Sequence, residues 1–211
     1  YTRNHDADLT AELQTMKQLE RRQERSDTVD ELMGVEGMAA RTYFTGLSKL
    51  VEPAFAFQGR SRQPPRDAFN SMLSLGYTML LYELYAEIED RGMSPYVGFL
   101  HREHRGHPSL ASDLMEEWRA VIVDTLVMSL VQGHEVRIAQ FAEDPDTGGI
   151  LLQPDAMRTF IRKFEKRMET TVSYLGSGSC SLRRCLYLQT TAFARAVEER
   201  DAEQYQPVQI R

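Results

Sequence analysis

Apolar side chains in this chain recur every three or four residues over most of its length, which is the spacing of a helix face. Leu73, Tyr77 and Leu80, for example, fall on one such face. No convincing run alternates apolar and polar residues between turn signals, and only GGILLQ at 148–153 has the composition of a strand. The pattern therefore predicts an all-α, multi-helix fold.

Capping residues, prolines and glycines divide this pattern into separate helices. Thr28 followed by Glu31 is a capping box that begins one of them. The GSGS stretch at 176–179 reads as a flexible break before the last helix. We assign residues 1–26 to a polar helix or linker and residues 27–211 to one helical domain. The expected helices span roughly 6–25, 28–51, 66–90, 109–132, 154–174 and 181–200.

Composition excludes several classes of protein. The chain has 211 residues and a net charge of −6, which argues against a generally basic nucleic-acid binder. Basic residues nevertheless cluster locally, as Arg60, Arg62 and Arg66 do in GRSRQPPR. No run of eighteen apolar residues is long enough to span a membrane. Cys180 and Cys185 lack the second Cys/His pair of a zinc site, so we interpret them as reduced thiols.

Glu36 lies within an apolar stripe of its predicted helix, together with Leu32 and Tyr43. A carboxylate that faces a core needs a cation, because an unpaired buried charge costs several kcal/mol. That cation is either a metal ion or an arginine such as Arg41 or Arg60. The spacing alone favours neither.

A second group of polar residues lies further along the chain. Asp113 and Glu116 are three residues apart, at the rim of a buried helix face. His101 ends the apolar run YVGFLH, and His104 and His107 are rival histidines in the loop that follows. One imidazole with two or three carboxylates suits Mg²⁺ or Mn²⁺ better than structural zinc.

Asn70 is a further polar residue on an apolar stripe. A core-facing amide must hydrogen-bond to something buried. We expect Asn70 to orient either an active-site carboxylate or a phosphate.

Four segments in this order resemble the C-terminal catalytic helical domain of the CRISPR-associated endonuclease that integrates new spacers, the first-numbered, universal Cas protein. The resemblance runs from about residue 27 to residue 207. Nothing in the chain matches the β-rich N-terminal domain that members of that family carry. An upstream segment, a fused N-terminal domain or a reduced variant would each explain this departure. The four segments are DELMGVEGMAARTYF, FQGRSRQPPRDAFNSMLSLGYTMLLYEL, GMSPYVGFLH and PSLASDLMEEWRAVIVDTLV.

The resemblance implies that Glu36, His101 and Glu116 are the catalytic metal ligands, for Mg²⁺ or Mn²⁺. It places Asp113 and Asn70 in supporting positions near the site. Arg60, Arg62 and Arg66 are expected to bind DNA phosphates.

The implied activity is a metal-dependent transesterification that joins spacer DNA into a CRISPR array, in the cytoplasm of a prokaryote. The implied partners are double-stranded DNA, a second copy of the chain and the second-numbered Cas protein. Two alternatives stay open. One is a non-catalytic helical scaffold that binds DNA or a partner, and the other is an unrelated metal-dependent nucleotide hydrolase.

Overall fold

The computed structural model describes residues 7–101, 106–174 and 178–208. The chain divides into two compact units. One comprises Tyr1–Ser71 with Leu130–Ala156, and the other comprises Met72–Ser129 with Met157–Arg211. Among the described residues, no helix has the length and apolar character needed to cross a membrane.

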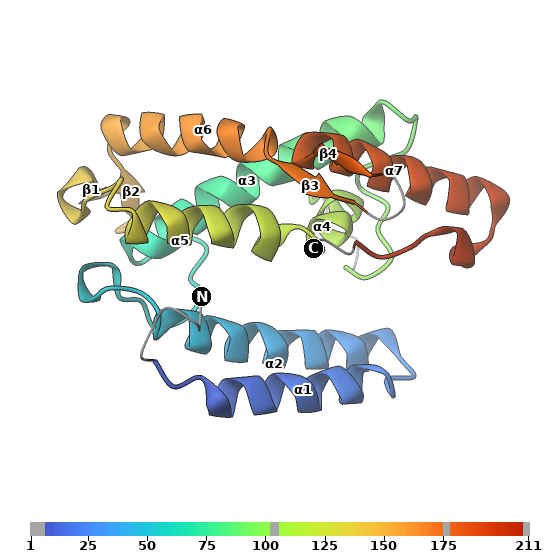
Figure 1. The fold of residues 1–211 in the computed structure, drawn as a ribbon, viewed down its shortest axis with the longest axis horizontal. Helices are drawn as coiled ribbons and strands as arrows, with labels where there is room; N and C mark the ends of the chain where they lie inside the picture. The colour runs from blue at the N-terminus through green and yellow to red at the C-terminus, as the bar shows by residue number, and fades with distance from the viewer. Residues whose placement is uncertain (1–6, 102–105, 175–177, 209–211) are drawn as a thin grey trace. The chain divides into compact units, whose positions relative to one another are not determined.

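The first unit contains a helical hairpin of α1 (Thr10–Gln23) and α2 (Val29–Ser48), which pack side by side (Figure 1). Thr28 caps α2 as its sequence predicts, since its hydroxyl accepts a hydrogen bond from the Glu31 amide at 3.2 Å. The far end of the hairpin is held by an ion pair between Lys49 and Glu12, with Nζ and Oε1 2.6 Å apart. The ion pair joins the start of α1 to the residue that follows α2, the helix that carries Glu36.

Aromatic residues form part of the core of the first unit, beside buried aliphatic side chains. Phe57 stacks on Phe69 with ring centroids 4.4 Å apart, and Phe55 meets Phe141 edge to face. Phe141 begins strand β1 (Phe141–Glu143), which pairs antiparallel with β2 (Ile150–Leu152). The strand suspected in GGILLQ is thus confirmed. The short helical turn Pro53–Phe55 and the turn Ile138–Gln140 complete this unit.

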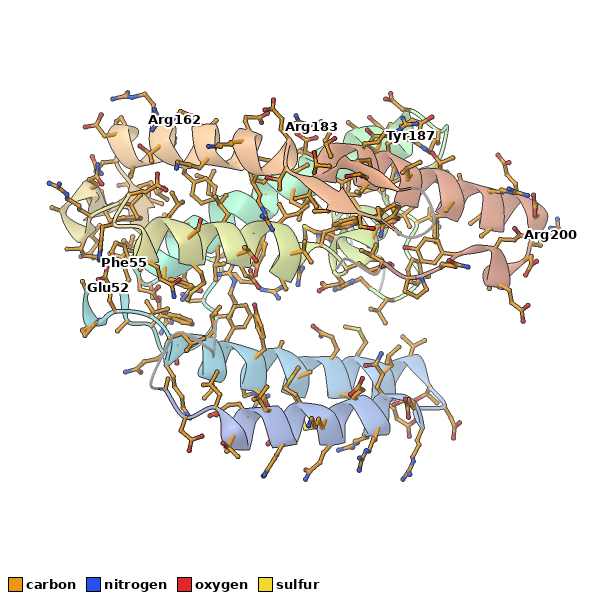
Figure 2. All side chains as sticks on the ribbon, viewed as in Figure 1. Glu52, Phe55, Arg162, Arg183, Tyr187 and Arg200 are labelled. Carbon is orange, nitrogen blue, oxygen red and sulfur yellow. The ribbon has the colours of Figure 1, made fainter. Side chains whose placement is uncertain are left out.

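The second unit is built on most of α3 (Ala68–Glu89), α6 (Pro154–Met168) and α7 (Leu182–Glu199). Its core is apolar, and Trp118, Phe160 and Phe164 are fully buried. Gly76 allows close packing within this core, because a Cβ at that position would lie 2.5 Å from Val123 Cγ1. Arg183 of α7 ties three helical segments together by binding Glu83 of α3 and Glu165 of α6 (Figure 2).

The helix expected over 109–132 is interrupted, which corrects the sequence prediction. Helix α4 (Ser109–Met115) ends before a turn at 116–118, a π-helical segment follows at Arg119–Asp124, and α5 covers Thr125–Gln132. The break is stabilised by tertiary contacts, since the Trp118 indole donates a 2.7 Å hydrogen bond to the buried amide of Gln189. Such contacts lie far apart in the sequence, so a local pattern does not reveal them.

A second small sheet also departs from the all-α expectation. Strand β3 (Thr171–Ser173) pairs antiparallel with β4 (Ser179–Ser181), immediately before α7. The GSGS break lies partly outside the described residues. Cys180 and Cys185 are free thiols with their sulfur atoms 3.4 Å apart. Burial raises the pKa of the Cys185 thiol to about 12, so this thiol stays protonated near neutral pH.

Candidate metal centre

Asp113 is the anchor of the candidate site. Its side chain is buried in α4, and its two oxygens accept hydrogen bonds from the backbone amides of Phe99, Leu100 and His101 at 2.6, 2.9 and 3.0 Å. One of these oxygens also lies 2.6 Å from Nδ1 of His101. We call this arrangement the Asp113 clasp. It fixes both the loop that carries His101 and the orientation of the imidazole.

Gly98 makes the clasp sterically feasible. A Cβ at this position would lie 2.6 Å from the carboxylate of Asp113 and 2.8 Å from Cβ of Ser109. No side chain fits in that space, so the loop reaches the carboxylate only because residue 98 is glycine. The sequence contained this signal in YVGFLH, but the need for glycine there depends on a contact fifteen residues away.

The clasp changes the proton affinity of both partners. The hydrogen bond to Asp113 raises the pKa of His101, and this outweighs the opposing effect of burial. Burial acts to raise the pKa of Asp113, but the hydrogen bonds from His101 and the three amides together lower it. Asp113 is therefore an ionised acceptor for the Nδ1–H group of the imidazole, and a carboxylate in this position orients a metal-binding histidine in its neutral form, with Nε2 left available.

Glu116 lies at the end of α4, near the clasp. Its charge contributes to the raised pKa of His101, and its Oε1 is 2.7 Å from an Nη of Arg119. The Arg119 guanidinium in turn lies over the ring of Tyr77, whose hydroxyl donates a 2.5 Å hydrogen bond to buried Asp124. The sequence interpretation did not single out Arg119, Tyr77 or Asp124, because only the fold brings α3 beside the π-helical segment.

The rival histidines differ from His101 in what they contact. Nε2 of His107 lies 3.2 Å from the hydroxyl of Ser112. His104 lies outside the described residues. Of the two described histidines in this region, only His101 is held by the buried carboxylate of Asp113. Within the described part of the chain, Nε2 of His101 makes no hydrogen bond.

Glu36 lies on α2 in the first unit. Its side chain is half-buried, as are Leu32, Ala39 and Tyr43 on the same stripe, so the expected burial is only partly realised. Among the described residues of its own unit, Glu36 has no hydrogen bond or ion pair, and a salt bridge to Arg41 is therefore not observed there. Its convergence with His101 and Glu116 stays a prediction.

Asn70 is fully buried at the start of α3, and its amide is saturated by protein groups. Its Oδ1 accepts from an Nη of Arg60 at 2.9 Å and from the Ser61 amide at 3.0 Å, while its Nδ2 donates to the Gly59 carbonyl and to Asp67. We call this arrangement the Asn70 clasp. It holds the loop at 59–61, and its hydrogen bonds leave no amide atom for a phosphate.

The three candidate DNA-binding arginines lie in different environments. The Arg60 guanidinium is half-buried and is bound by Asn70 and by the Ser61 carbonyl, whereas Arg62 and Arg66 are exposed. All three line a hollow of about 600 Å³ that is formed by the loop from Ala56 to Asp67. Arg60 therefore supports the loop, whereas Arg62 and Arg66 reach solvent.

The donor set fits a hard divalent cation. His101 presents Nε2 with its other ring nitrogen held by a carboxylate, and Glu116 adds an oxygen donor nearby. Within the described ranges, no three His, Cys, Asp or Glu side chains form a ready-made metal cluster. His101 and Glu116 therefore form one side of a candidate site that needs a further ligand.

The fold is a helical scaffold, and the site holds a histidine oriented by a carboxylate, with a second acid nearby. These features define the class of the protein as a candidate helical metal-binding protein. A family description, CRISPR associated protein Cas1, matches residues 1–166. The CRISPR-associated endonuclease Cas1 of Mycobacterium tuberculosis is 42% identical over 193 residues, which cover 90% of this chain and 57% of that protein. The chain belongs to the Cas1 family.

Solved structures agree with this assignment. A Cas6-RT-Cas1–Cas2 complex contains a chain that superposes with a TM-score of 0.86 at 27% identity, covering 94% of this chain and 22% of that one. A casposase bound to its integration product superposes with a TM-score of 0.79 at 26% identity, covering 92% of this chain and 58% of that one. The chain spans little more than half the length of the Mycobacterium relative, 57% of it.

Proposed function

We propose that this chain is the catalytic part of a metal-dependent DNA integrase that joins spacer DNA into a CRISPR array. The single observation that carries the proposal is the Asp113 clasp, in which Nδ1 of His101 lies 2.6 Å from a buried carboxylate. A metal-binding histidine is typically oriented in this way, through its other ring nitrogen. The names of the relatives, an endonuclease and a casposase with its integration product, support the choice of DNA as substrate.

Glu36, His101 and Glu116 are the proposed ligands of Mg²⁺ or Mn²⁺. When bound, such an ion polarises a scissile phosphate and stabilises charge on the leaving oxygen. Asp113 keeps the imidazole in the tautomer and orientation that leave Nε2 available. Arg119 neutralises Glu116 and fixes its carboxylate at the end of α4.

Arg62 and Arg66 are the proposed contacts to DNA phosphates, because their guanidinium groups reach solvent at the rim of the loop hollow. Arg60 contributes chiefly by keeping that loop in shape. The second-numbered Cas protein is a proposed partner, since the name of one structural relative contains Cas2. A homodimer and a fused N-terminal domain are further proposals that rest on the family resemblance alone.

Strand joining on branched DNA tests the proposal. We expect Glu36→Ala and His101→Ala to abolish joining in the presence of Mn²⁺ while leaving the melting temperature nearly unchanged. Glu20→Ala, which removes an exposed acid from α1, is the matched control and should join normally. Joining that survives in both site variants would overturn the assignment of the metal ligands, whereas DNA binding without any joining by the unmodified protein would favour a non-catalytic DNA scaffold. Hydrolysis of free nucleotides without joining would favour a nucleotide hydrolase.

A further inference from the structure

The segment after α7 returns to the candidate site. Helix α7 ends at Glu199, with Arg200 in the left-handed conformation that closes it, and a short turn at Ala202–Gln204 follows. The segment at 205–208 then contacts Glu117, the residue next to Glu116. We call residues 205–208 the C-terminal strap. It lies beyond residues 1–166, over which the family description matches.

Glu117 binds the strap through both carboxylate oxygens. One accepts a 2.5 Å hydrogen bond from the hydroxyl of Tyr205, and the other accepts a 2.6 Å bond from the backbone amide of Val208. Gln189 also donates to the Tyr205 hydroxyl at 2.9 Å. Burial and the bond to Glu117 raise the pKa of Tyr205, so the hydroxyl stays protonated and keeps donating.

The position of Glu117 makes these bonds important for the site. Residues 116–118 form the turn where α4 ends and the π-helical segment has not begun, so an uninterrupted α-helical ladder does not hold them. Backbone hydrogen bonds from Glu116 to Asp113 and from Trp118 to Met115 close this turn, at 3.3 and 2.9 Å. Side chains hold it further, since Trp118 is bound by Gln189 and Glu117 by the strap. The placement of Glu116 thus also depends on the two residues that follow it.

The ring of Tyr205 supports the histidine side of the site. It meets Phe193 edge to face at 5.7 Å between centroids, and Phe193 stacks on Phe99 at 5.6 Å. The Phe99 amide is one of the three that Asp113 binds. The Phe99 side chain is 58% exposed and lines an apolar hollow of about 420 Å³ beside Phe193 and Tyr205. Asp113 holds the Phe99 backbone, and the largely exposed Phe99 ring is held by its stack on Phe193.

We propose that Tyr205 is a positioning residue for the metal site, acting on Glu116 through Glu117 and on His101 through Phe193 and Phe99. This inference rests on the proposed function, because it assumes that His101 and Glu116 bind the metal. Tyr205 has no direct role in chemistry. It sets the separation of two ligands whose supporting segments are a turn and a loop.

Mn²⁺ affinity, measured by titration calorimetry, tests the inference independently of DNA joining. Loss of an outer residue that orients a metal ligand typically weakens binding by about 10- to 100-fold. We expect Tyr205→Ala to weaken Mn²⁺ binding about tenfold, at the lower end of that range. Tyr205→Phe keeps the ring and its contact with Phe193, so it should weaken binding less, by about threefold. Tyr187→Ala is the matched control, because Tyr187 lies on the same helix as Phe193 but contacts Arg91 and Arg184 instead (Figure 2).

A double-mutant cycle separates positioning from a general loss of structure. Tyr205→Phe and Glu117→Ala both remove the hydrogen bond between these two residues, so Tyr205→Phe should lower Mn²⁺ affinity less in the Glu117→Ala background than in the unmodified protein. The bond that Gln189 donates to the Tyr205 hydroxyl is the part still lost in that background. Unchanged affinity in Tyr205→Phe and Tyr205→Ala, with normal binding by the unmodified protein, would overturn the positioning role alone. If the unmodified protein binds no Mn²⁺, or if His101→Ala binds it equally well, the proposed function fails and the inference fails with it.

Discussion

Asn70 in the first unit and Asp113 in the second are both buried polar side chains on a helix, and each holds a loop by its backbone. The Asn70 amide makes four hydrogen bonds, and all four are to protein groups. The Asp113 carboxylate binds three amides and also an imidazole. All partners of the Asn70 amide are therefore protein groups, whereas the Asp113 clasp holds a ring whose second nitrogen, Nε2, makes no hydrogen bond within the described residues.

This difference shows what a polar residue on an apolar helix face can and cannot reveal. The pattern correctly predicted that Asn70 needs buried partners, and it placed Asp113 only at the rim of a buried helix face. It did not predict whether those partners are structural, because the partners come from loops at other positions in the chain. A buried polar group on a helix thus indicates that its side chain holds another segment in place. A functional site requires, in addition, that the segment it holds carry a side chain able to bind a ligand.

Replacing Asp113 should have the largest effect. Asp113→Ala leaves three amides and an imidazole without their buried acceptor, so we expect a loss of about 3–5 kcal/mol in the free energy of unfolding. Mn²⁺ affinity should fall at least about tenfold in the protein that remains folded. Urea unfolding and titration calorimetry measure the two effects. Asp113→Asn keeps one carbonyl oxygen as an acceptor. Its free energy of unfolding and its Mn²⁺ affinity should therefore lie between those of Asp113→Ala and those of the unmodified protein.

Replacing Asn70 should destabilise the chain without affecting the metal. Asn70→Ala removes the acceptor of Arg60 and the donor to the Gly59 carbonyl, at a cost of roughly 2–4 kcal/mol in the free energy of unfolding. Mn²⁺ affinity of the folded protein should not change. A loss of affinity as large as that of Asp113→Ala would show that the two clasps do not differ in function.

Charge reversal distinguishes the arginines of the Asn70 loop. Arg62→Glu with Arg66→Glu should lower DNA affinity about tenfold at low salt and reduce its salt dependence, because these side chains are exposed. Arg60→Glu should instead lower the melting temperature, since it removes the bond to Asn70. Filter binding across a salt series, together with thermal melts, checks both outcomes. If Arg60→Glu alone weakens DNA binding at unchanged stability, Arg60 is a phosphate contact after all.

The helices with local signals were predicted closely. Thr28 caps α2 where expected, and the predicted spans 66–90 and 181–200 agree with Ala68–Glu89 and Leu182–Glu199 to within two residues. Capping residues and turn residues act over a few positions, so a single sequence contains enough information to locate these boundaries.

Features that depend on distant contacts were not predicted. The break at 116–118 is held by Gln189 and Tyr205, which are more than seventy residues away. The three-residue strands β3 and β4 are too short to show an alternating pattern. At the site, the residue types of His101 and Asp113 indicated metal chemistry, but the hydrogen bond between them became evident only when the loop was placed against α4.

The smallest effect is expected from replacing Ser112. This replacement tests whether His101 or His107 binds the metal. Ser112→Ala removes the hydroxyl that contacts Nε2 of His107, and one such hydrogen bond contributes about 0.5–1.5 kcal/mol to the free energy of unfolding. If the Asp113 clasp selects His101 as the ligand, Mn²⁺ affinity should stay unchanged in Ser112→Ala and in His107→Ala. His101→Ala serves as the positive control and should abolish binding. Tighter Mn²⁺ binding in Ser112→Ala, with loss of binding in His107→Ala, would identify His107 as the ligand that the Ser112 hydroxyl restrains.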